Sequence, residues 1–146
     1  MLGYSDFVFR DIEPRKQSPS SIPVVSGLIQ RGDEAMWSDD WQSAENCYVA
    51  AHFILGGQDN TTKTKIGMVK RIMNVQAVAK HASARVESAR YTANMLSATL
   101  EDIEEALDAL LPLRIELPHS EDLMTVEGHL DSVLRKGRRM QASYPH

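Results

Sequence analysis

The sequence predicts an all-α protein, a helical bundle with one long central helix at about residues 62–111. This segment contains no proline and a single glycine, Gly67. From Val75 onward, small or apolar residues recur in steps that alternate four and three, the heptad rhythm of a helix that keeps one seam against another helix. Aromatic residues make up only 6% of the chain, which fits a helical protein better than a sandwich or barrel. The seam positions are Val75, Ala79, Ala82, Val86, Ala89, Ala93, Leu96, Leu100, Ile103, Leu107 and Leu110.

The totals indicate one helical domain, residues 22–146, preceded by an N-terminal arm, residues 1–21. A chain of 146 residues with 42% hydrophobic and 25% charged residues has the composition of a globular protein. A formal net charge of −4 argues against a protein that coats nucleic acid. The single cysteine, Cys47, excludes an intrachain disulfide and favours a cytoplasmic location. We find no signal-peptide pattern and expect no membrane span.

The arm is broken by prolines and a serine cluster, so no long element is expected there. Phe7 and Phe9 alternate with polar neighbours. They could dock on a groove of this molecule or of a neighbouring copy, and a disordered tail is the alternative.

A helix pair is predicted at residues 22–57. The first helix starts near Ser21, because Pro23 then falls in its first turn, where a missing N–H is tolerated. Residues 38–40 offer caps for the second helix, and Gly56 and Gly57 end it. The second helix places Trp41 and Tyr48 on one apolar face.

Residues 32–51 resemble a single tetratricopeptide helix pair. The small and aromatic residues at that family's packing positions are Gly32, Trp41, Ala44, Tyr48 and Ala51. With a third helix, Trp41, Ala44 and Tyr48 also resemble the aromatic–alanine–aromatic positions of a microtubule-interacting-and-trafficking (MIT) module. We find no second repeat, so a solenoid is not expected. Either resemblance implies helical packing.

A weaker resemblance is to the HEPN bundle, through residues 47–53 and 64–69. HEPN nucleases need an arginine four to six residues before a histidine, and residues 47–69, which include both stretches of the resemblance, contain no arginine. Arg114 stands five residues before His119, but outside these stretches. The resemblance therefore implies an RNA-associated bundle without the nuclease activity.

The long helix is polarised in charge. Its first part carries the basic residues Lys63, Lys65, Lys70, Arg71, Lys80, Arg85 and Arg90. Its last part carries the acidic residues Glu101, Asp102, Glu104, Glu105 and Asp108. This order opposes the helix dipole, and an antiparallel copy of the same helix would set opposite charges together. A solvated surface with uneven charge is the alternative.

After residue 111, Pro112 and Pro118 bracket a predicted turn, and a C-terminal helix follows at residues 120–142. A connection of this length favours antiparallel packing on the second half of the long helix. The last turns carry a basic patch whose charges are expected to stay unpaired within the chain. This patch, which could touch phosphate, an anionic lipid surface or an acidic partner, comprises Arg135, Lys136, Arg138 and Arg139.

No catalytic, metal or cofactor site is predicted, and we expect a protein that is not an enzyme. The histidines lie on different elements. Glu116 and His119 have ligand spacing, but Pro118 lies between them and removes the one-face geometry of a helical metal site. Cys47 has no basic neighbour to activate it, so we interpret it as a packing residue.

The sequence therefore predicts a helical adaptor or chaperone that binds a partner helix. One alternative is a self-assembling structural subunit that uses the arm and the polarised helix as a homo-oligomer. The other is the HEPN-like RNA-associated bundle. The predicted partner-binding residues are Trp41, Tyr48, Ala82, Val86, Ala89, Ala93 and Leu96.

Overall fold

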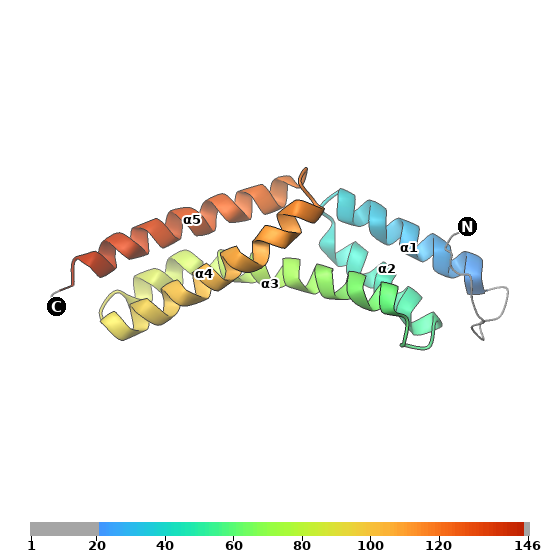
Figure 1. Cartoon of the computed structure of the whole chain (residues 1–146), viewed down its shortest axis with the longest axis horizontal. Helices are drawn as coiled ribbons and strands as arrows, with labels where there is room; N and C mark the ends of the chain where they lie inside the picture. The colour runs from blue at the N-terminus through green and yellow to red at the C-terminus, as the bar shows by residue number, and fades with distance from the viewer. Residues whose placement is uncertain (1–20, 145–146) are drawn as a thin grey trace.

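The protein is all-α, as the sequence predicts. A computed structural model describes residues 21–144, so the predicted arm with Phe7 and Phe9 lies outside the described part (Figure 1). The helices are α1 (Ser21–Trp37), α2 (Trp41–Ile54), α3 (Asn60–Ala89), α4 (Ala93–Glu116) and α5 (Glu121–Ala142). Within residues 21–144, no helix combines the length and the apolar character needed to cross a lipid bilayer.

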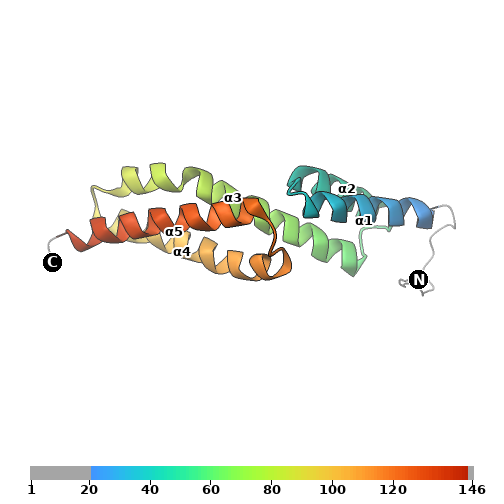
Figure 2. The same cartoon turned by 90° about the horizontal axis from the view of Figure 1, so that it is seen from above.

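The molecule is elongated, and α3 runs along most of its length (Figure 1). The α1–α2 hairpin packs on the first half of α3, and α4 and α5 pack on the second half (Figure 2). One hydrophobic core runs without interruption from Met36 and Trp41 through the buried side of α3 to Val133 on α5. The predicted helix pair at residues 22–57 and the predicted C-terminal helix at 120–142 thus correspond to α1–α2 and α5.

Four of the helices begin with a side-chain N-cap, which satisfies an otherwise unpaired backbone N–H. Asp40, Asp59 and Ser120 accept hydrogen bonds from Ser43 N, Thr62 N and Leu123 N, at 3.3, 2.9 and 3.2 Å. The cap that the sequence predicts at residues 38–40 is confirmed by Asp40. Thr92 caps α4 in the same way, accepting from Met95 N at 3.2 Å. Gly56 and Gly57 end the α2 segment at φ values of +83° and +77°, which glycine adopts at little cost.

The prediction of one continuous helix at 62–111 is wrong. Helix α3 ends at Ala89, and residues 90–92 turn the chain back, so that α4 packs antiparallel on α3 (Figure 2). A straight helix of about 75 Å in a single chain would leave a long apolar stripe in water. Because the chain folds back, the alanine-rich half of the seam on α3 packs against the leucine-rich half on α4.

One basic and one acidic residue of the charge-polarised segment pair with each other within the chain. Arg85 on α3 lies 2.7 Å from Asp102 on α4, measured from Nη2 to Oδ2. Lys65, near the start of α3, instead pairs with Asp33 on α1. The antiparallel packing of α3 and α4 also sets their helix dipoles in opposite directions.

The C-terminal half of the bundle also differs from expectation in two details. Helix α4 continues through Pro112 to Glu116 instead of ending at residue 111. Helix α5 packs antiparallel on α4, as expected, with buried Gly137 against Leu100. However, Arg138 forms an ion pair with Glu104 on α4, so the prediction that the basic patch stays unpaired is wrong.

Candidate protein-binding surface

Helix α2 is held between α1 and α3 by a close contact at its middle. Tyr48 is 1% exposed, and its ring lies over Gly32 on α1. A Cβ atom at position 32 would lie 2.4 Å from Tyr48 Cε1. Only glycine allows the ring to approach the α1 backbone this closely. The spacing of a small residue in α1 and an aromatic one in α2 therefore sets the distance between these helices.

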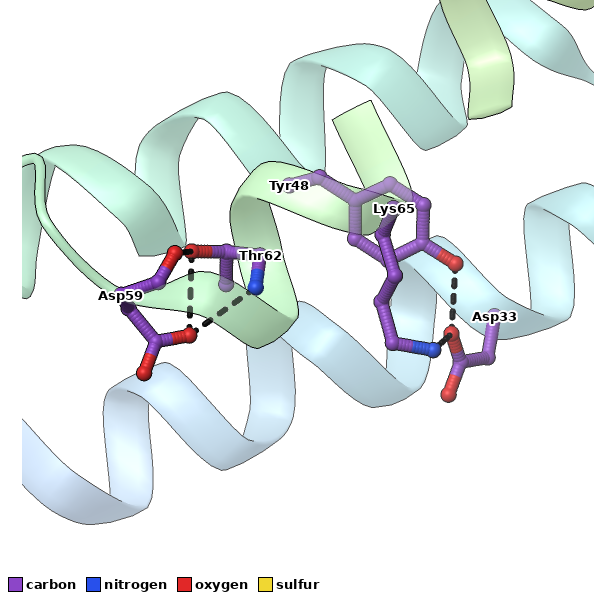
Figure 3. Close-up of polar contacts among 5 residues, drawn as sticks. All are labelled: Asp33, Tyr48, Asp59, Thr62 and Lys65. Atoms are coloured by element: carbon purple, nitrogen blue, oxygen red, sulfur yellow. Dashed lines mark hydrogen bonds and ion pairs between the residues drawn. The ribbon is translucent and has the colours of Figure 1, made fainter. Parts of the chain in front are cut away.

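The hydroxyl end of Tyr48 joins all three helices (Figure 3). It donates a 2.5 Å hydrogen bond to Asp33 Oδ1 on α1, and Lys65 Nζ on α3 lies 2.9 Å from the same oxygen. Lys65 also lies 5.5 Å from the centre of the Tyr48 ring. Burial, and then the hydrogen bond to Asp33, raise the pKa of the Tyr48 phenol above its usual range. The phenol therefore stays protonated and fixes α2 in one orientation.

The C-terminal end of α2 is tied to the start of α3. His52 Nδ1 lies 2.6 Å from Thr62 Oγ1, and Thr62 is completely buried. Thr62 in turn donates from N and Oγ1 to Asp59 Oδ2, at 2.9 and 3.2 Å (Figure 3). These contacts hold α2 against α1 and α3 and determine which of its sides faces outward.

The outer side of α2 is apolar and exposed. Phe53 is 82% exposed, Val49 45% and Ile54 38%. Residues 47–54 contain no Asp, Glu, Lys or Arg, and the polar groups of Tyr48 and His52 are bonded to Asp33 and Thr62. A helix segment that is also apolar on its outer side is normally buried there as well. We call Val49, Phe53 and Ile54 the α2 outer face.

The turn between α1 and α2 contacts the turn between α4 and α5, and these contacts hold the α1–α2 hairpin against the rest of the bundle. Asp39, at φ +61°, accepts hydrogen bonds from Ser120 Oγ at 2.7 Å and from Asp122 N at 3.1 Å. Trp37 stacks on His119 with ring centres 3.5 Å apart. We call this set of contacts the two-turn junction. It connects residues about 80 positions apart and holds the hairpin in place.

Most of the predicted partner-binding residues form the core instead of a surface. Trp41 is 6% exposed, and its Nε1 donates to Asp122 Oδ2 at 3.1 Å. Tyr48, Ala82, Val86, Ala89 and Leu96 are at most 2% exposed. The partner that covers the heptad seam in this structure is the chain's own α4. Ala93, in the first turn of α4, is exposed.

The predicted basic patch is partly neutralised by its neighbours. Arg138 pairs with Glu104, and Arg135 Nη2 lies 2.6 Å from Asp131 Oδ2 one turn away on α5. Lys136 and Arg139 remain exposed on the same helix. The four residues therefore do not form one uncompensated cationic surface.

An open groove of about 560 Å³ lies between α3 and α4, near the turn that joins them. Its lining residues are His81, Ala84, Arg85, Ser88, Ala89, Met95 and Thr99. Arg85 is already paired with Asp102, and the remaining lining is mostly small. Within residues 21–144 we find no group of three His, Cys, Asp or Glu side chains that could hold a metal ion.

Sequence reasoning missed the α2 outer face because it followed the stripe of Trp41 and Tyr48. A helix with one buried stripe has an opposite side, and here that side is also apolar. The absence of charge from residues 47–54 was the signal that could have found it.

Comparison of the chain with protein-family models, with curated proteins and with solved structures finds no match. The function of the α2 outer face is therefore inferred from its own residues.

Proposed function

We propose that this protein is a non-enzymatic protein–protein interaction module whose α2 outer face binds an apolar helix of a partner protein. The observation that carries the proposal is the 82% exposure of Phe53 on a helix segment without charge. Fully burying a phenylalanine or valine side chain is worth about 1.5–3 kcal/mol each. Leaving such side chains in water is costly unless another molecule covers them.

The shape of the face favours a helical partner. Val49 and Phe53 are four residues apart and therefore lie above one another on the same side of α2, and Ile54 flanks them. A row of this kind fits the i, i+3 and i+4 positions of a second helix. A central aromatic side chain with smaller apolar neighbours is also the usual anchor of an interface.

The face has a polar border at one end. Asn46 and Gln42, about one and two turns before Val49 on α2, are exposed, and Gln42 Nε2 donates a hydrogen bond to Asn46 Oδ1 at 3.1 Å. An apolar centre with a polar rim is the common arrangement of protein interfaces. The centre itself offers a partner no acid, base or nucleophile, which supports binding without chemistry.

The proposal includes a cytoplasmic location. It is supported by the lone, half-buried Cys47, since small helical proteins in oxidising compartments often depend on disulfides.

Site-specific photo-crosslinking tests the proposed function. A photoreactive amino acid replaces Phe53 in one version of the full chain and Ile115 in another, because Ile115 is 78% exposed but lies on α4. In cells of the source organism, we expect a crosslink to a protein partner from position 53 and none from position 115. Phe53→Asp should abolish co-purification of that partner, while its circular dichroism stays that of the original protein.

Equal capture from both positions, or capture that survives Phe53→Asp, would show that the α2 outer face is not the binding surface. Because Phe53 makes no core contact, Phe53→Asp should change the free energy of unfolding by less than about 0.5 kcal/mol. This separates a loss of binding from a loss of fold.

A further inference from the structure

The turn between α3 and α4 is unusual for a helical hairpin because it contains neither glycine nor proline. It consists of Arg90, Tyr91 and Thr92. Arg90 still has helical backbone angles, φ −62° and ψ −19°. Thr92 is extended, with φ −134° and ψ 137°, and caps α4. Nothing in the residue types of this turn prevents it from becoming helical.

The apolar pattern passes through the turn without a change of phase. Val86, Ala89, Ala93 and Leu96 are spaced by three, four and three residues. An ordinary interhelix loop interrupts the heptad, because its residues do not contribute to a common seam. Here a straight helix through residues 90–92 would keep α3 and α4 on one continuous seam.

A straightened chain would lose the partner of that seam. In the closed form, α4 and α5 cover Ala82, Val86 and Ala89, which are at most 2% exposed. With α4 carried away from α3, these side chains and the facing leucines would meet water. A second straightened copy, aligned antiparallel, could cover them with the same residues.

We propose that the chain forms a homodimer in which two copies exchange α4 and α5 by straightening at Arg90, Tyr91 and Thr92. The occupant of each uncovered seam is thus the α4–α5 pair of the other copy. Charge supports this choice, because Arg85 of one copy meets Asp102 of the other and the ion pair of the closed form is kept.

The exchanged dimer retains nearly every contact of the closed monomer. The core contacts of α3 with α4 and α5 and the two-turn junction re-form between copies, while the Arg138–Glu104 ion pair stays within the exchanged α4–α5 pair. Only the turn itself differs between the two forms. Concentration and the conformation of residues 90–92 therefore set the balance between them, as is general for dimers that exchange an identical element.

Two single substitutions move this balance in opposite directions. Thr92→Ala removes the N-cap that stabilises the turn and replaces it with the best helix former. Ala93→Pro places proline at the first residue of α4, after an extended residue, where it fits the closed form. In a continuous helix the same proline would lie in the interior, remove a hydrogen bond and clash with the preceding turn.

Sedimentation of the full chain tests the proposal after refolding at about 1 µM to about 1 mM. The original protein should show a dimer fraction that rises with concentration. Thr92→Ala should lower the dimer dissociation constant at least about tenfold, since each dimer replaces two turns. Ala93→Pro should raise it more than about a hundredfold and leave the thermal midpoint of the monomer unchanged.

A charge-reversal pair identifies the exchanged contact. Arg85→Glu and Asp102→Arg each set like charges together within one chain. In a mixture, exchanged heterodimers pair Glu at 85 of one copy with Arg at 102 of the other, and Arg85 with Asp102. We expect heterodimers in excess over either homodimer, with the excess falling as salt rises.

Three outcomes would overturn the proposal. They are a monomer at every concentration for both the original protein and Thr92→Ala, a dimer that persists unchanged in Ala93→Pro, and random mixing of the charge-reversed copies. If Ala93→Pro fails to fold, a Gly-Ser-Gly insertion after Tyr91 serves instead, because a longer flexible turn also favours the closed form. Phe53→Asp should leave dimer formation unchanged, which separates this test from that of the α2 outer face.

Discussion

The carboxylate of Asp39, in the turn between α1 and α2, accepts a 2.7 Å hydrogen bond from the hydroxyl of Ser120, in the turn between α4 and α5. The same carboxylate accepts a bond from Asp122 N at 3.1 Å, through its other oxygen. Asp39 has φ +61°, a conformation that Asp and Asn tolerate better than other residues with a side chain. Asp39 therefore sets the backbone of the α1–α2 turn and also accepts the hydrogen bonds of Ser120 and Asp122.

Asp39→Ala should reduce the free energy of unfolding by about 2–4 kcal/mol, because it removes two charge-assisted hydrogen bonds and leaves alanine at positive φ. Asp39→Asn, which keeps one of the two acceptor oxygens and tolerates the backbone, should cost about half as much, about 1–2 kcal/mol. Denaturant unfolding gives both values, and amide exchange should show faster opening of α1 and α2 in Asp39→Ala. Equal losses in the two variants would mean that the two-turn junction does not depend on this carboxylate.

Gly32→Ala should destabilise the protein by about 2 kcal/mol or more, because the added Cβ would lie 2.4 Å from a Tyr48 ring that Asp33 holds in place. Gly27, also on α1, provides the control, since a Cβ there meets nothing within 4 Å. Gly27→Ala should stabilise the helix by about 0.5–1 kcal/mol. Thermal unfolding of the two variants should move in opposite directions from the original protein; a shift in the same direction would disprove the close approach at Gly32.

The stabilising effect of the Tyr48 hydroxyl should disappear in alkaline solution. The folded state raises the pKa of this phenol above its unfolded value of about 10. The contribution is therefore fully present below pH 10, and above pH 10 it falls by up to about 1.4 kcal/mol per pH unit, because only the unfolded chain gives up the proton. Tyr48→Phe should be less stable than the original at pH 7, and the difference should shrink between pH 10 and 11. Parallel pH curves for the two proteins would contradict the shift.

Arg138→Ala should change the free energy of unfolding by less than about 1 kcal/mol, since both partners of the Arg138–Glu104 ion pair are about half exposed. Gly137→Ala, one residue away, should cost more, because its Cβ would lie 2.3 Å from Leu100 Cδ2 inside the α4–α5 contact. Unfolding at about 0.1 and 1 M salt separates the two effects: only the Arg138 difference should fade with salt. A large loss for Arg138→Ala that persists in high salt would point to a packing role for this side chain.

Local signals in the sequence predicted most of the helix boundaries. Caps at Asp40, Asp59 and Ser120 and the glycine pair at 56 and 57 act through bonds between near neighbours, so they can be read without knowing the fold. The break at Thr92 was missed because its only local mark is a threonine, a residue that also occurs inside helices. What decides that break is the burial of α3 against α4, a contact between distant parts of the chain.

The candidate surface shows the same limit. Trp41 and Tyr48 were rightly grouped on one face of α2, but periodicity alone does not say whether α1 and α3 or a partner cover that face. In the structure, α1 and α3 cover the face of Trp41 and Tyr48, and Phe53 stays exposed on the other side of α2. Which apolar residue of α2 stays exposed can be determined only once the packing of the helices is known.

Helix α3 contributes side chains to both ends of the molecule, Val69 and Ile72 toward the hairpin and Val86 and Ala89 toward α4. Unfolding of either end would expose one half of α3 and would destabilise the helix on which the other end packs. The described part of the chain should therefore unfold on heating in a single cooperative step, and limited proteolysis should release no stable fragment.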